Sequence, residues 1–172
     1  MSHSHNHNVD VGTFTVSQKL KGLMFSFIVI GLLTFVVGLV TDKERIWQSY
    51  LVNYWFFISL ALGGLFFTAV QHATKAGWSA TVRRIYESFP AFLPVAAVLT
   101  LVYVIFGSHS MYEWLHKEVV EKDVLLRHKA GYLNMGAWSV RLVIFFAIWI
   151  GFKKILVGNS VKQDQTGDEN LT

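Results

Sequence analysis

The residue that most strongly suggests chemistry is Arg141, a lone charge in the otherwise apolar run at positions 132–152. It stands about eight residues into that run, roughly 12 Å along a helix. A charge at that depth in a bilayer costs about 2.5–3.5 kcal/mol unless it is paired, hydrated or able to reach the interface. Asn134 and Trp138 share its helical face at i−7 and i−3. The three residues are candidates for a polar-headgroup site or a proton route, with a structural ion pair or a snorkelling side chain as the alternative.

An ion pair would need an acidic partner, and no apolar run contains Asp or Glu. The nearest candidates are Asp42, which follows the first run, and Glu113, which precedes the last one. Both fall on the side of the membrane from which Arg141 would be reached. They are the expected counter-charges within this chain.

A second candidate site is a rim of amphipathic side chains on that same side. Its members are Asn53, Tyr54, Trp55, Trp114, His116, Tyr132 and Asn134. A quinone ring favours aromatic walls, and its carbonyl oxygens favour hydrogen-bond donors. Asn53 and His116 are therefore quinone-site candidates. The same residue types form the aromatic belt of any membrane interface, and composition alone favours the belt.

His72 follows Gln71 at the opposite end of the second run. A b-type haem between two helices needs two facing histidines at bilayer depth, and no other apolar run contains a histidine. His72 is a proton-route candidate, with an ordinary hydrogen-bonded interfacial histidine as the alternative. Because the sequence has no cysteine, disulfides, zinc-thiolate sites, iron–sulfur clusters and covalently attached c-type haem are excluded within it. We expect no metal site and no bound cofactor, whereas a diffusible quinol or quinone is compatible.

Four apolar runs position these residues. Charged residues are only 15% of the 172, against about a quarter in soluble proteins, and the runs are almost free of them. About 20 helical residues cross the hydrocarbon core. The runs cover about 22–41, 51–71, 89–106 and 132–152. We therefore expect an all-α integral membrane four-helix bundle over 21–158, a polar His-containing tail at 1–20, and a polar tail or truncated linker at 159–172.

Two connecting segments carry further information. An apolar stripe recurs at helical spacing before the third run, formed by Trp78, Val82, Ile85 and Phe89. It predicts a short amphipathic helix lying in the membrane interface, with Arg83, Arg84 and Glu87 on other faces. The long polar segment at 107–131 contains aromatic residues. It is either a docking surface or a cover for the end of the bundle.

The distribution of lysine and arginine predicts the orientation. One side holds eight of them: Lys19, Lys21, Lys75, Arg83, Arg84, Lys153, Lys154 and Lys162. The other side holds six: Lys43, Arg45, Lys117, Lys122, Arg127 and Lys129. The bias favours both termini in the cytoplasm. The net charge of +4 is thus interpreted as membrane topology, and no nucleic-acid partner is expected.

Several runs, taken in order, resemble the ActF-type membrane subunits of alternative complex III. The matching runs are Leu51-Val-Asn-Tyr-Trp-Phe-Phe, Ala61-Leu-Gly-Gly-Leu-Phe-Phe, Val70-Gln-His-Ala-Thr-Lys-Ala-Gly-Trp78, Phe92-Leu-Pro94, Trp114-Leu-His116, Tyr132-Leu-Asn134 with Arg141, and Lys162-Gln-Asp-Gln-Thr-Gly-Asp168. The resemblance covers nearly the whole chain from about Lys19. It is carried by the order and spacing of the runs, because no single one is diagnostic.

The resemblance implies a quinone-binding membrane subunit of a bacterial respiratory quinol:cytochrome c oxidoreductase, distantly related to NrfD and polysulfide reductase membrane subunits. Such subunits are haem-free helix bundles in the inner membrane, and their partner subunits carry iron–sulfur clusters and haem c on the periplasmic side. Members of the family continue into a second bundle, and positions 159–172 resemble the linker before it. The sequence is therefore expected to be the N-terminal half of such a subunit, a split subunit or a shortened paralogue.

The function expected from this resemblance is support of quinol binding, proton conduction or assembly in the complex, and it carries over no catalytic residue. One alternative is a purely structural subunit. Another is a small transporter or channel. Transporters usually place ionisable groups at the bilayer midplane and break their helices there. Only Arg141 meets the first condition here, and Pro94 lies near the end of a run, which argues mildly against transport.

Overall fold

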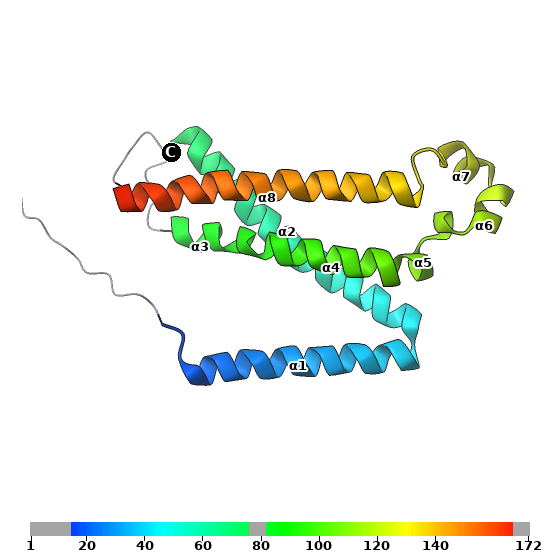
Figure 1. Cartoon of the computed structure of the whole chain (residues 1–172), viewed down its shortest axis with the longest axis horizontal. Coiled ribbons are helices and arrows are strands. Elements are labelled where there is room, and N and C mark those ends of the chain that lie inside the picture. Colours follow the sequence, from blue (N-terminus) through cyan, green and yellow to red (C-terminus); the bar gives the residue numbers. More distant parts are fainter. Residues whose placement is uncertain (1–14, 76–81, 167–172) are drawn as a thin grey trace, which may run out of the picture. The chain divides into compact units, whose positions relative to one another are not determined.

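The computed structural model describes residues 15–75 and 82–166, and every regular element in these ranges is a helix (Figure 1). The predicted all-α class is confirmed. By length and composition, three helical stretches could cross a membrane: Gln18–Thr41, Lys43–Thr74 and Arg83–Phe106. The chain divides into two compact units, Met1–Thr41 and Asp42–Thr172.

The first unit contains α1 (Gln18–Thr41), a helix of 24 residues with no buried residue. It includes the whole predicted run at 22–41. Hydroxyl groups inside it bond to its own backbone: Ser26 Oγ donates to Gly22 O at 3.0 Å, and Thr34 Oγ1 donates to Ile30 O at 2.9 Å. Its apolar side chains are therefore left to contact lipid or another helix. Most of the predicted His-containing tail, residues 1–14, lies outside the described residues.

The second unit begins with α2 (Lys43–Thr74), which has 32 residues and contains the predicted run at 51–71. The helix starts at Lys43 because the carboxylate of Asp42 accepts the backbone N–H of Arg45 at 3.1 Å. It ends where Lys75 takes a left-handed conformation with φ of 47°, and the N–H of Lys75 bonds to the carbonyls of Gln71 and His72.

The third predicted run, 89–106, belongs to a compound helix that begins before it, at Arg83. The compound helix consists of α3 (Arg83–Ser88), the 3₁₀ turn η2 (Phe89–Phe92) and α4 (Leu93–Phe106). Pro90 and Pro94 have no N–H, so the backbone tightens between them, and Leu93 N–H bonds to Pro90 O. α3 thus leads directly into α4, which differs from the separate interfacial helix predicted at 78–89. Residues 78–81 lie outside the described residues.

The predicted polar segment at 107–131 contains short helices, namely α5 (Ser108–Met111), the 3₁₀ turn η3 (Glu113–Leu115), α6 (Lys117–Lys122) and α7 (Val124–Lys129). The last element is α8 (Met135–Thr166), with 32 residues. It continues through Asn159–Thr166, where the sequence predicted a polar tail or linker. In this stretch the carbonyl oxygen of Ser160 and the side chain of Gln163 accept hydrogen bonds from arginine side chains of α3, as described below.

The core of the second unit lies where α2 meets α4 and α8. Its buried residues are Ile58, Ala61 and Leu65 from α2, Leu93 and Ala96 from α4, and Phe146 from α8. In Figure 1, α4 and α8 run along each other and α2 crosses both. At Gly64, α2 passes close to α3 and η2, because a Cβ added there would lie 2.6 Å from Tyr86 O and 2.7 Å from Phe89 Cβ. Only glycine lets the two backbones approach to this distance.

Candidate functional site

An aromatic cluster joins the short helices at 108–131 to α8. Trp138 of α8 contacts the rings of Tyr112 and Trp114, with centroid distances of 5.4 and 5.5 Å. Tyr112 and Trp114 stack on each other at 5.2 Å. Edge-to-face and offset pairs of this kind are favourable beyond the area they bury. The predicted candidate Trp138 is thus one wall of an aromatic group at this end of the unit.

The ring contacts continue into the space between α2 and α4. Tyr103 contacts Tyr112 at 6.1 Å and stacks on Tyr50 at 6.1 Å, and Tyr50 stacks on Tyr54 at 6.3 Å. Tyr50 Oη donates to Leu99 O at 2.7 Å, and Tyr54 Oη shares a hydrogen bond with Thr100 Oγ1 at 2.5 Å. These hydroxyl groups tie α2 to α4. Sequence analysis placed Tyr54 on a rim, whereas the structure puts it half-buried between helices.

Arg141 finds its partner within α8 and the turn before it. Its Nη2 donates to the carbonyl oxygen of Tyr132 at 3.0 Å, and its guanidinium carbon lies 3.9 Å from the centroid of the Tyr132 ring. The expected acidic partners are used or placed elsewhere: Asp42 caps α2, and Glu113 is exposed in η3. Both ion pairs found among the described residues involve Glu87 instead.

Asn134 acts as the N-cap of α8. Its Oδ1 accepts the backbone N–H of Ala137 at 2.8 Å, and its Nδ2 donates to the carbonyls of Ala130 and Gly131 at 3.0 and 2.9 Å. The amide therefore has three local contacts, and it starts α8 at Met135 instead of at Tyr132. A signal for this role was present in the sequence, since asparagine is among the preferred N-cap residues.

His116 and Asn53 stand outside the aromatic cluster. His116 Nε2 lies 2.9 Å from His109 O, and the two imidazole rings are 5.4 Å apart. Asn53 Nδ2 donates to Ser49 O one turn earlier on α2, and its side chain is exposed. The structure thus brings Trp138, Tyr112 and Trp114 together but does not bring Asn53 to them.

His72 lies on α2 near its C-terminal end, and His72 Nδ1 lies 2.8 Å from Thr68 O. A carbonyl oxygen can only accept, so Nδ1 carries the hydrogen and Nε2 of the neutral ring is an acceptor. Nε2 is buried, and so is Oε1 of Gln71, and neither has a hydrogen-bond partner among the described residues. Two buried acceptors of this kind call for donors such as water. This is the environment in which a proton-route role for His72 would operate.

An ionic cluster around the buried carboxylate of Glu87 was not identified from the sequence. Glu87 of α3 has a side chain only 2% exposed, and it pairs with Arg83 at 3.0 Å and Arg84 at 2.7 Å. Both arginines also reach α8: the Arg83 guanidinium donates to Gln163 Oε1 at 3.1 and 3.2 Å, and Arg84 Nη2 donates to Ser160 O at 3.3 Å. The pattern of charges on α3 suggested a solvated helix face, and only the position of α8 turns it into a buried cluster.

The second unit has two hollows in this region, and the first of them is lined in part by Trp114 of the aromatic cluster. A cleft of about 350 Å³ lies over the segment after α4, with His109, Trp114, Lys117, Glu121 and Asn134 among its lining residues. A groove of about 410 Å³ lies between α4 and α8. Its lining is apolar except for the hydroxyl groups of Thr100 and Ser139. Among the described residues, no group of three or more His, Asp or Glu side chains is arranged to hold a metal ion.

Over the residues that the structure describes, the protein is all-helical, and three of its helices are long and apolar enough to span a membrane. No protein-family model matches the chain, and no curated protein sequence is significantly similar to it.

Proposed function

We propose that the chain is a multi-span membrane subunit of a respiratory quinol:cytochrome c oxidoreductase of the alternative complex III type, in the bacterial inner membrane. The ordered sequence runs that resemble ActF-type subunits motivate the proposal. The structural observation that carries it is the apolar groove between α4 and α8.

The groove suits a quinol by size and by lining. Its volume of about 410 Å³ falls in the range of roughly 300–1,000 Å³ typical of small-molecule sites. Leu101, Val104 and Phe146 offer an apolar surface to an isoprenoid tail, and Ser139 offers a hydroxyl group to a ring oxygen. The hydroxyl of Thr100 is already engaged, because it donates to Ala96 O and shares a hydrogen bond with Tyr54. Trp138 is adjacent in sequence to Ser139 and belongs to the aromatic cluster. With α4 and α8 crossing the bilayer, as proposed here, the groove would open to the apolar phase from which a quinol would enter.

The proposal includes α8 as a fourth spanning helix, so that the chain forms a four-helix bundle with both termini in the cytoplasm. At 1.5 Å per residue, the 32 residues of α8 extend about 48 Å, beyond the roughly 30 Å of the hydrocarbon core. Between Met135 and Phe152 its one charged residue is Arg141. Packing of α8 on α2 and α4 through Phe146 supports this arrangement.

The redox centres of such a complex would belong to partner subunits. In this proposal the partners carry the iron–sulfur clusters and haem c, and this chain contacts quinol, conducts protons or supports assembly. Purification of the affinity-tagged chain from its native host tests the proposal. We expect copurifying subunits with haem c and iron–sulfur clusters, and quinol:cytochrome c activity. A chain that purifies without any redox-active partner would refute it.

The role of the groove has a sharper test. Val143 lines the groove, whereas the next residue, Ile144, does not. Val143→Trp should therefore reduce photolabelling of the complex by an azidoquinone and reduce quinol turnover, while Ile144→Trp should leave both unchanged. Assembly is scored separately on native gels. Equal labelling of the two assembled variants would exclude the groove as the quinol contact.

A second candidate function is a purely structural subunit, and one observation favours it. Arg141 and Asn134 make local contacts that define the start of α8 and leave their polar groups engaged. Under this alternative, the tagged complex retains full quinol turnover in the Val143→Trp variant and in variants of His72.

A further inference from the structure

The hairpin formed by α6 and α7 carries an apolar patch that the rest of the second unit does not cover. Val124 and Leu125, the first residues of α7, are 68% and 71% exposed. Leu126, the next residue, is half-buried, and α7 packs against α6. In Figure 1 the hairpin lies beyond the ends of α4 and α8. Exposed aliphatic side chains at such a position need a covering surface.

The local structure of α7 fixes the direction of these side chains. Oδ1 of Asp123 accepts the backbone N–H groups of Leu125 and Leu126 at 2.7 and 3.3 Å, so the helix begins sharply at Val124. The last turn consists of Arg127, His128 and Lys129, all exposed. α7 therefore presents two adjacent aliphatic side chains and, directly after them, a basic turn.

The depth of α7 relative to a membrane is set by its connection to α8. Lys129 O accepts the backbone N–H groups of Tyr132 and Leu133 at 2.9 and 2.8 Å, so α7 ends within one turn of Tyr132. Tyr132 is exposed and carries the guanidinium of Arg141 on its ring. An exposed tyrosine with an arginine side chain reaching back to it is typical of the polar boundary of a bilayer. If α8 crosses a bilayer, the basic turn of α7 would therefore lie at headgroup level.

We propose that α7 is an interfacial anchor, in which Val124 and Leu125 insert into the bilayer surface and the basic turn binds the phosphates of phospholipid headgroups. Apolar burial in the interface and attraction of basic side chains to anionic lipid both contribute to binding of this kind. The proposal rests on membrane insertion of the chain and not on any role in quinol oxidation. A protein partner is disfavoured, because stable interfaces bury about 800 Å² on each partner, far more than two side chains offer.

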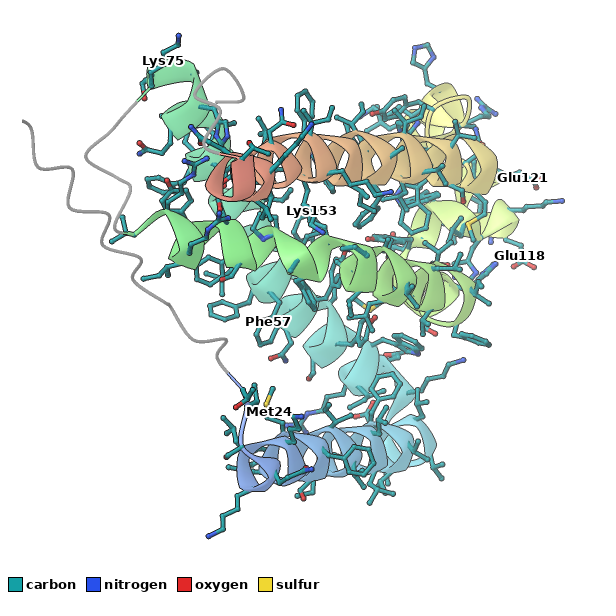
Figure 2. All side chains as sticks on the ribbon, turned by 60° about the vertical axis from the view of Figure 1, so that its left-hand side comes forward. Met24, Phe57, Lys75, Glu118, Glu121 and Lys153 are labelled. Atoms are coloured by element: carbon teal, nitrogen blue, oxygen red, sulfur yellow. The ribbon has the colours of Figure 1, made fainter. Side chains whose placement is uncertain are left out.

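The absence of cysteine from the sequence makes a spin-label test clean. Leu125→Cys is labelled in the full chain and reconstituted into vesicles of phosphatidylcholine, with or without phosphatidylglycerol. Collision with oxygen reports bilayer exposure, and collision with a nickel chelate reports water exposure. The matched control is Glu118→Cys on α6, whose side chain is exposed on the same hairpin (Figure 2). Val98→Cys, on an exposed face of α4, reports whether the protein is inserted at all.

We expect the label at position 125 to favour oxygen and the label at position 118 to favour the nickel chelate. Phosphatidylglycerol should deepen the label at position 125. Arg127→Gln with Lys129→Gln should abolish this deepening, whereas Lys154→Gln should not. With the label at position 98 in the bilayer, a water-exposed label at position 125 overturns the proposal. Immobilisation of that label only in the native complex also overturns it, in favour of a protein partner. A water-exposed label at position 98 would instead contradict membrane insertion itself.

Discussion

The guanidinium of Arg141 lies 3.9 Å from the ring centroid of Tyr132 and donates a 3.0 Å hydrogen bond to the carbonyl oxygen of the same residue. Tyr132 precedes α8, and Arg141 lies in its second turn. The contact therefore folds the entering chain back onto the helix. The contact stabilises the positive charge of Arg141 without an acidic residue, because the ring face and the carbonyl oxygen of Tyr132 both carry partial negative charge.

This contact predicts how Arg141 responds to substitution. The planar guanidinium stacks on the ring and donates at the same time, which an ammonium group cannot do. Arg141→Ala should lower the free energy of unfolding in detergent by about 1–2 kcal/mol, and Arg141→Lys should recover only part of that. In a Tyr132→Leu background, which keeps the carbonyl but removes the ring, Arg141→Ala should cost less.

The outcome also separates the roles considered for Arg141. Wild-type stability of Arg141→Ala would show that the contact stabilises nothing. Lost quinol turnover in a complex that is stable and fully assembled would instead place Arg141 on the quinol or proton route. Full rescue by Arg141→Lys would indicate a simple snorkelling cation.

The close crossing at Gly64 predicts different effects at two neighbouring glycines. A Cβ at position 64 meets Tyr86 O at 2.6 Å and Phe89 Cβ at 2.7 Å, whereas a Cβ at position 63 meets nothing within 4 Å. Gly64→Ala should therefore destabilise the second unit by about 1–3 kcal/mol through overpacking. Gly63→Ala should be neutral or stabilising, by up to about 1 kcal/mol, because alanine favours helix. Unfolding in a denaturing detergent series measures both, and equal effects would show that the helices do not approach at Gly64.

The apolar runs could be located from sequence because a bilayer forces uncharged residues into continuous stretches. Runs 22–41 and 51–71 lie inside α1 and α2. The helix ends were less predictable. α2 extends back to Lys43 and α8 extends to Thr166, through charged residues that hydropathy assigns to loops. Asp42 and Asn134 are of residue types that commonly cap helices. Many other polar residues in the sequence could do the same, and only the packing shows which of them do.

The candidate site was predictable only where contacts are local. Asn134 and Arg141 were recognised as candidates. Asn134 accepts the N–H of Ala137, and Arg141 donates to Tyr132 O instead of pairing with a distant acid. The ionic cluster at Glu87 was missed because its two arginines bond to Gln163 and Ser160, more than 70 residues away in sequence. Helical periodicity reports the faces of one helix and carries no information about which helix covers them.

Glu87 should be the most sensitive ionisable residue on α3. Glu87→Gln leaves two arginine side chains without their carboxylate beside α8. Breaking a fully buried pair costs about 3–5 kcal/mol, and we expect roughly 2 kcal/mol here because the side chains of Arg83 and Arg84 are 22% and 44% exposed. Gln163→Ala should cost less, because it removes a neutral acceptor only. Thermal unfolding of the reconstituted chain measures both. An unchanged midpoint for Glu87→Gln would contradict the cluster.

The same cluster fixes which ends of the helices share a side of the membrane. Arg83 and Arg84, at the start of the third apolar helix, bond to Gln163 and Ser160 near the end of α8. These two ends therefore lie together, and the α6–α7 hairpin lies at the other end of the unit (Figure 2). If α4 and α8 each cross the bilayer, as proposed, the two ends must face opposite compartments. The lysine and arginine distribution predicts that the end carrying the cluster faces the cytoplasm.

Cysteine labelling in intact cells tests this orientation, because the unmodified sequence contains no cysteine to react. Glu118→Cys on α6 should react with a membrane-impermeant maleimide added to cells whose outer membrane is permeable. Lys162→Cys near the end of α8 should react only after the inner membrane is opened, and the cysteine-free chain is the control. Both positions are exposed, so a difference in labelling reports the compartment and not burial. Equal labelling of the two variants in intact cells would show that α8 does not cross the bilayer. The reverse pattern would keep the crossing but invert the orientation, and it would remove the argument that the Glu87 cluster faces the cytoplasm.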